Sequence, residues 1–166
     1  MILSAVLAPR PAGAQGPEPG QPAPDFRLPL LQAGEAALTE YRGRPVIINF
    51  WASWCEPCRA EMPDLISARD THSPAGLEIL AVNLTDQEVR RDVRAFVADL
   101  GMTFPVLLDE RGRTRRRYEL VTIPTTVFVD TAGVVRLLHQ GPLTPAALAR
   151  GLALILPAHP ASGEEP

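Results

Sequence analysis

The stretch WASWCEPCRAEMP, residues 51–63, contains Cys55 and Cys58, the only two cysteines in this chain of 166 residues. They stand three positions apart, and Trp54 directly precedes the first of them. A structural staple, a metal clamp, a haem anchor and a redox couple all use cysteine pairs of this kind. The residues around the pair distinguish these four uses.

Three of the four uses lack what they require. A structural zinc site needs four ligands, and the histidines that would complete one are scattered singly along the chain: His72, His139 and His159. A c-type haem anchor needs histidine directly after the second cysteine, where this chain has Arg59. As a staple, a disulfide across so short a loop constrains the unfolded chain little. Redox chemistry remains, but not of the peroxidatic Pro-x-x-x-Thr-x-x-Cys kind, since Ile48 and Ala52 occupy those positions.

The segments next to the pair predict a strand followed by a helix. Residues 44–51 (RPVIINFW) form a β-branched apolar run without alternation, which is typical of a strand buried on both faces. After the cysteines, Met62, Leu65 and Ile66 follow helical spacing, so we expect a helix to begin at the cysteine pair. Residues 77–84 (LEILAVNL) predict a second buried strand.

The rest of the chain continues the alternation of strands and helices. We expect a helix capped by Thr85 or Asp86 to end at Gly101. A last helix should begin with Thr144 as its cap and Pro145 as its first residue. Between these helices the sequence predicts a strand at 104–109, a short helix at 113–120, and an antiparallel hairpin of 125–130 with 134–139. This order indicates an α/β domain with a mixed sheet.

The two ends of the chain differ in composition from this domain. Six of the eighteen prolines precede Asp25, which disfavours helix and sheet there. A short apolar run and the small residues 12–14 lead us to interpret residues 1–24 as the remnant of an export signal and a disordered linker, with a floppy tail as the alternative. The domain is expected to span residues 25–157, followed by a disordered tail at 158–166.

The two cysteines are expected to have different roles. Cys55 stands at the start of the helix, where unpaired N–H groups and the helix dipole stabilise a thiolate. Cys58 lies one turn inside and should be the more buried, resolving thiol. Pro57 falls in the first turn, where its missing N–H costs little. The carboxylate of Glu56 disfavours the neighbouring thiolate, so we expect a reductant or a mild exchanger and not a strong oxidant.

Extended to NFWASWCEPCRAEMP, the motif resembles the thioredoxin superfamily, and most of all its TlpA/ResA-type thiol-disulfide oxidoreductases, which are membrane-tethered or periplasmic. The segments APDFRLPLL, FPVLLDERG and IPTTVFVDTAGVV also fit, so the resemblance covers nearly the whole chain from Asp25. It implies a thioredoxin fold, in which helices flank a mixed central sheet, with an N-terminal hairpin and a central αβ insertion between Thr85 and Asp109.

The resemblance also implies roles for single residues. Pro124 matches the cis-proline that packs beside the cysteines, and its cis bond would let the backbone of Ile123 pair with an extended substrate. Pro63 matches the proline that kinks the active-site helix. Glu61 matches an acidic residue that is a candidate proton acceptor, with a solvated helix carboxylate as the alternative. Asn49 replaces the buried aspartate of thioredoxin and cannot accept a proton, which leaves this task to Glu61 or water.

Two further features are open to two interpretations each. Trp51 and Trp54 are expected to shield the disulfide and present an apolar rim to partners, although Trp51 equally suits core packing. The arginine-rich run RGRTRRRYEL, residues 111–120, suggests either an anionic partner or a solvated helix face, in which Glu119 pairs with Arg115 or Arg116. We favour the solvated face and expect no nucleic-acid partner, because the net charge is only −3.

The function predicted is a thiol-disulfide oxidoreductase outside the cytoplasm that reduces disulfides of exported proteins through Cys55 and Cys58. By resemblance, its partners include apocytochrome c and a membrane thiol-disulfide electron donor. It needs no organic cofactor, because the cysteine pair is itself the redox group. The segment YELVTIPTT lacks the GVxGxPET pattern of the cytochrome c-specialised branch, so the substrate stays open. A copper-carrying CxxC module and a non-catalytic interaction domain of the same fold are the alternatives.

Overall fold

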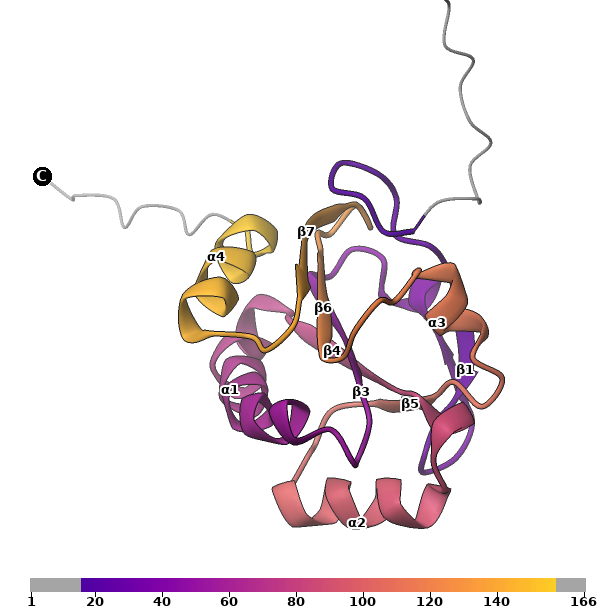
Figure 1. The fold of residues 1–166 in the computed structure, drawn as a ribbon. Coiled ribbons are helices and arrows are strands. Elements are labelled where there is room, and N and C mark those ends of the chain that lie inside the picture. The colour runs from indigo at the N-terminus through magenta and orange to yellow at the C-terminus, as the bar shows by residue number, and fades with distance from the viewer. Residues whose placement is uncertain (1–15, 158–166) are drawn as a thin grey trace, which may run out of the picture.

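A computed structural model describes residues 16–157 of the chain. A five-stranded sheet in the order β5-β4-β3-β6-β7 forms its centre (Figure 1). The strands are β3 (Val46–Trp51), β4 (Glu78–Asn83), β5 (Val106–Leu108), β6 (Thr125–Val129) and β7 (Val135–Gln140). The first three run parallel, whereas β6 is antiparallel to both β3 and β7, so the sheet is mixed, as predicted.

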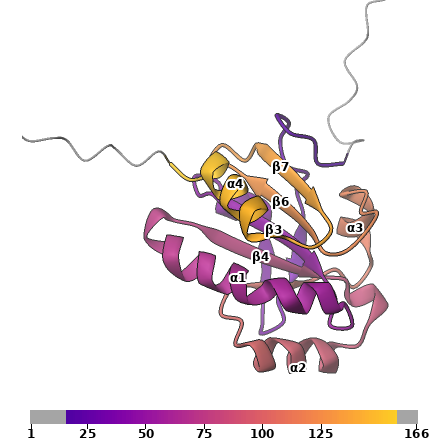
Figure 2. The same cartoon turned by 60° about the vertical axis from the view of Figure 1, so that its left-hand side comes forward.

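Helices and a hairpin cover the two faces of this sheet. The α1 (Glu56–His72) and α4 (Pro145–Ile155) helices lie side by side on one face (Figure 2). The short helix α3 (Arg113–Arg117) and the hairpin of β1 (Arg27–Pro29) and β2 (Glu35–Ala37) cover the other. Helix α2 (Arg90–Leu100) and β5 lie between Thr85 and Asp109, where the insertion was expected. Short 3-10 turns occupy Leu38–Tyr41, Ser73–Ala75 and Thr85–Gln87.

The central strand β3 explains why its sequence does not alternate. All six of its residues are buried. Ile47 and Trp51 pack into the apolar cluster under α1 and α4, while Ile48 and Phe50 pack into the cluster on the opposite face. Because both faces of this strand pack against apolar clusters, apolar residues are needed on both faces, and the sequence does not alternate.

Most predicted helix boundaries are confirmed. Cys55 is the N-cap of α1, so the cysteine pair does begin this helix. Thr144 caps α4 by accepting a hydrogen bond from the backbone N–H of Ala147 at 3.2 Å, and Pro145 is the first helical residue. Gly101 ends α2 in the left-handed conformation, with φ of 65°.

Two predictions around α2 and α3 are wrong. Neither Thr85 nor Asp86 caps α2, which begins at Arg90 without a side-chain cap. The Thr85 hydroxyl donates instead to Asn83 Oδ1 at 2.8 Å, which holds this segment in a 3-10 turn. Helix α3 ends at Arg117, and Arg115 pairs with Asp86 at 3.1 Å, so the predicted pairing with Glu119 does not occur in the described part of the chain.

The start of the domain differs from the composition-based boundary. Within 16–24, the backbone N–H groups of Gly20 and Ala23 donate to the carbonyls of Val135 and Gly133, so packing begins before Asp25. The export-signal prediction for residues 1–15 and the tail prediction for 158–166 lie outside the described residues. Within the described range, no helix combines the length and the apolar character needed to cross a membrane.

Candidate active site

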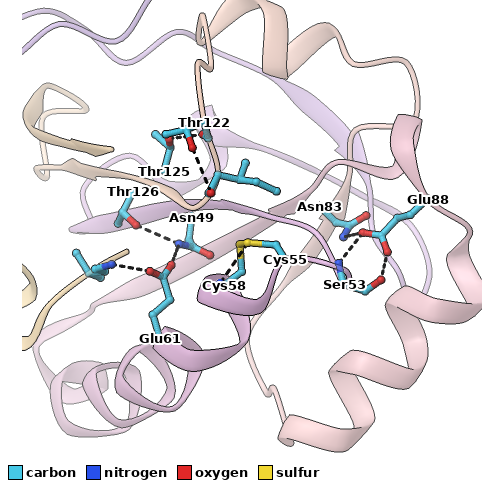
Figure 3. The surroundings of a disulfide bond; sticks show 12 residues. Asn49, Ser53, Cys55, Cys58, Glu61, Asn83, Glu88, Thr122, Thr125 and Thr126 are labelled. Carbon is cyan, nitrogen blue, oxygen red and sulfur yellow. Dashed lines mark hydrogen bonds between the residues drawn. A yellow bond between two sulfur atoms is a disulfide. The ribbon is translucent and has the colours of Figure 1, made fainter. Parts of the chain in front are cut away.

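The two cysteines form a disulfide at the start of α1, with their Cα atoms 5.3 Å apart (Figure 3). Cys55 keeps 5% of its surface exposed, and Cys58 keeps none. The order of burial predicted from the sequence is therefore confirmed. Of the two cysteines, only Cys55 therefore has any surface open to solvent.

The environment of Cys55 favours a negative charge on its sulfur. Its Sγ accepts a hydrogen bond from the backbone N–H of Cys58 at 3.2 Å. Helix α1 has 17 residues, and its positive end faces this sulfur. When the disulfide is reduced, both interactions stabilise a thiolate at Cys55 over a thiol. Glu56 and Pro57 follow as exposed residues of the first turn.

Glu61 is buried one turn beyond Cys58, with only 3% of its surface exposed. Its carboxylate accepts hydrogen bonds from Asn49 Nδ2 at 2.8 Å and from the backbone N–H of Leu143 at 2.7 Å. Burial raises the pKa of Glu61 above its ordinary value, although these two hydrogen bonds act in the opposite direction. The alternative interpretation of Glu61 as a solvated helix carboxylate is therefore wrong.

The raised pKa of Glu61 makes its contribution to stability depend on pH. A carboxyl group whose pKa is higher in the folded state stabilises the fold at low pH, and this contribution is lost as pH rises from the unfolded-state pKa through the folded-state pKa. Glu61→Gln does not titrate. We therefore expect the stability of wild type relative to Glu61→Gln to fall with rising pH across this window. Urea denaturation of both oxidised proteins at several pH values measures their free energies of unfolding. If the free energy of wild type minus that of Glu61→Gln rises with pH, the burial argument is wrong.

The two tryptophans occupy different environments. Trp51 is fully buried and stacks on Phe96 with ring centroids 4.5 Å apart, so it belongs to the core and not to a rim. Trp54 is 57% exposed. Of the two interpretations of Trp51, core packing is the one that the structure confirms.

The loop before β6 lies next to the loop of Trp54. The Ile123–Pro124 bond is cis, as predicted, and Pro124 is buried. Ile123 and Trp54 line the same open hollow of about 340 Å³, together with Val121, which is 83% exposed. This hollow has a mixed polar and apolar lining and lies beside Trp54, the residue directly before Cys55. Its remaining lining residues are Leu84, Gln87, Arg115, Leu120 and Thr122.

A polar cluster that the sequence analysis missed holds the loop in front of Cys55. The carboxylate of Glu88 accepts hydrogen bonds from the backbone N–H of Ser53 at 2.9 Å, from the Ser53 hydroxyl, and from Asn83 Nδ2 at 2.7 Å (Figure 3). These contacts tie the loop to the end of β4. The available signal was Asn83, a polar residue at the end of an otherwise apolar strand.

The arginine-rich run makes contacts within the chain. Arg115 pairs with Asp86, the Arg116 guanidinium donates to the carbonyl of Arg111, and that of Arg117 donates to the carbonyl of Asp25 at 2.5 Å. These contacts attach α3 to the surrounding loops.

The comparisons with known proteins agree with this geometry. The AhpC/TSA family profile matches residues 19–138. Thioredoxin-like protein YneN of Bacillus subtilis is 37% identical over 140 residues, covering 84% of this chain and 81% of that protein. Thiol-disulfide oxidoreductase ResA of Geobacillus thermodenitrificans is 36% identical over 138 residues, covering 83% and 78%.

Solved structures give the same result. The thiol:disulfide interchange protein DsbE of Chlorobium tepidum is 34% identical with a TM-score of 0.76, covering 83% of this chain and 97% of its own. StoA of Bacillus subtilis is 30% identical with a TM-score of 0.67, covering 80% and 98%. With a cysteine pair at the start of a helix on a thioredoxin fold, the chain therefore belongs to the AhpC/TSA family, as a thiol-disulfide oxidoreductase of the ResA/StoA type.

Proposed function

We propose that this enzyme reduces disulfides of exported proteins outside the cytoplasm, with apocytochrome c as one substrate, and that a membrane thiol-disulfide protein returns it to the dithiol form. The observation that carries the proposal is the position of the Cys55 sulfur at the N-terminus of α1, directly after Trp54, which lines the open hollow. A sulfur stabilised as a thiolate and reachable by a partner is what disulfide exchange requires.

The exchange proceeds in two steps. The Cys55 thiolate attacks one sulfur of the partner disulfide, the partner S–S bond breaks, and the other partner sulfur leaves as a thiolate. Cys58 then loses its proton and attacks Cys55, which forms the disulfide seen in the structure and releases the second partner sulfur. The partner gains two electrons and the enzyme loses two.

Glu61 is proposed as the acceptor of the Cys58 proton, directly or through water. Three positions separate Glu61 from Cys58 on α1, so both side chains lie on the buried face of this helix. The raised pKa of Glu61 brings its proton affinity closer to that of a thiol, which favours transfer between the two groups.

Substrate contacts are proposed on both sides of Cys55. An extended segment of the partner pairs with the backbone of Ile123 before Pro124, and an apolar side chain of the partner enters the hollow beside Trp54. Glu56 and Pro57 are exposed in the first turn of α1 and meet the partner from the helix side.

Val121→Ser tests the contact surface without altering the cysteines. We expect KM for disulfide-bonded apocytochrome c to rise about fivefold, since partial burial of a valine contributes about 1 kcal/mol. Turnover of a small disulfide such as oxidised glutathione should not change. Leu154→Ser is the matched control, because Leu154 is also exposed (47%) but lies on α4. Equal effects of the two variants would rule out the proposed surface.

Cys58→Ser tests the substrate class, because it blocks the second step and leaves the partner joined to Cys55. Disulfide-bonded apocytochrome c and disulfide-bonded insulin are each incubated separately with the reduced variant. Trapping of apocytochrome c at a rate well above that of insulin supports the proposal. Trapping of insulin alone would remove apocytochrome c as the substrate and leave the oxidoreductase activity standing.

A further inference from the structure

The amide oxygen of Asn49 is a buried hydrogen-bond acceptor without a partner. Asn49 has no exposed surface. Both hydrogens of its Nδ2 are used, one donated to Glu61 Oε1 at 2.8 Å and the other to Thr126 Oγ1 at 3.0 Å. Among the residues that the structure describes, no donor bonds to Oδ1. A buried acceptor left unpaired carries a free-energy cost, so such groups are rare and call for an explanation.

The unpaired oxygen lies on the side of β3 that faces the active-site helix. Ile47 and Trp51, two positions before and after Asn49, pack into the cluster that contains Cys58. The bond to Glu61 places the amide against α1 one turn beyond Cys58. In Figure 3 the Asn49 amide lies between Glu61 and Cys58.

Reduction of the disulfide creates a hydrogen-bond donor on Cys58. When a dithiol transfers two electrons to the Cys55–Cys58 disulfide, the S–S bond breaks, and Cys55 remains a thiolate at the helix start. The proton taken up with the electrons then resides on Cys58 Sγ. Cys58 is fully buried, so bulk solvent does not contact the new S–H group. The oxidised enzyme thus has a buried acceptor without a donor, and reduction adds a buried donor that needs an acceptor.

We propose that Asn49 Oδ1 accepts a hydrogen bond from the reduced Cys58 thiol and so stabilises the dithiol form of the enzyme. The amide is oriented for this in advance, because Glu61 and Thr126 hold both of its N–H groups. Asn49 is thereby a positioning residue that raises the reduction potential of the couple. This role concerns the couple itself and does not depend on which protein is the natural substrate.

Infrared spectroscopy tests the contact directly. The chain has two cysteines, so in Cys55→Ser the only S–H group belongs to Cys58. We expect its S–H stretching band to lie at lower wavenumber than in Cys55→Ser/Asn49→Leu, where the acceptor oxygen is replaced by a methyl group of similar size. Asn49→Asp, which keeps an acceptor, should retain the lower band. An unchanged band in the Leu variant would overturn the proposal. If the Leu variant does not fold, Asn49→Val makes the same comparison.

The reduction potential, measured against dithiothreitol, tests the consequence. Asn49→Leu should lower the equilibrium constant for reduction about tenfold, equivalent to ~30 mV. Thr126→Val is the matched control for loss of a polar contact of the amide, because it removes one partner of Nδ2 but keeps the Oδ1 atom and the bond to Glu61, and it should change the equilibrium constant by less than Asn49→Leu. Asn49→Leu is also compared with Asn49 in the Glu61→Gln background. This separates the contact of the amide with Glu61 from its proposed contact with the Cys58 thiol. A tenfold change that persists there supports the thiol contact, and its disappearance would assign the effect to Glu61 and overturn the proposal.

Discussion

Cys55→Ser is expected to reduce insulin at a rate roughly 10³-fold or more below that of wild type, because the substitution removes the catalytic nucleophile. A serine hydroxyl is not ionised at neutral pH and cannot form a mixed disulfide. The fold should persist, because Cys55 is the N-cap of α1 and serine is among the best N-cap residues. The loss is therefore a loss of chemistry and not of structure.

Cys58→Ser is the control that separates the two cysteines. It keeps the nucleophile and should give a burst of mixed disulfide with no further turnover, because the resolving thiol is gone. Far-ultraviolet circular dichroism of both variants checks that the helices are intact. Equal rates of insulin reduction for wild type and Cys55→Ser would show that Cys55 is not the attacking residue.

Gly151→Ala is expected to destabilise the protein by about 2 kcal/mol, although alanine is the better helix former. Helix α4 crosses β6 at Gly151, where an added Cβ would lie 2.3 Å from Phe128 Cε1 and 2.4 Å from two further ring atoms. The ring is fully buried in the cluster between α1, α4 and the sheet, so it has little room to move. Overpacking should therefore outweigh the gain in helix propensity of about 1 kcal/mol.

Urea denaturation of the oxidised protein measures this effect, and Ala149→Gly supplies the control. Ala149 is exposed on the same helix, so its replacement reports helix propensity alone. Phe128→Leu removes the ring, and in that background Gly151→Ala should cost less than in wild type. A Gly151→Ala protein that is more stable than wild type would show that propensity prevails and that the ring can yield.

Local signals in the sequence were sufficient for the order of the elements and for the position of the cysteine pair. The apolar run of β3, the helical spacing after Cys58 and the cap at Thr144 each depend on neighbours within a few positions. The prediction failed at Thr85 and Asp86, which are good N-cap residues by composition. The Thr85 hydroxyl bonds two residues back to Asn83, and Asp86 pairs with Arg115, 29 positions away, so neither side chain caps the helix.

Charge state and burial at the site were decided by contacts between distant segments. In the sequence, Glu61 is one of several acidic residues on a helix. In the fold it is bonded to Asn49 and Leu143, which are 12 and 82 positions away. Desolvation depends on everything that surrounds a group, so no local pattern reveals it. The bond between Glu88 and the backbone N–H of Ser53 likewise joins residues 35 positions apart, which no local pattern predicts.

The primary structure therefore specified the redox couple, because helix-start chemistry acts on Cys55 through the residues that directly follow it. Only the tertiary structure buried Glu61 and Asn49 together between α1 and β3, because side chains from several elements pack around them. Excluding water is what turns an ordinary carboxyl and an ordinary amide into groups that respond to the redox state of a neighbouring sulfur.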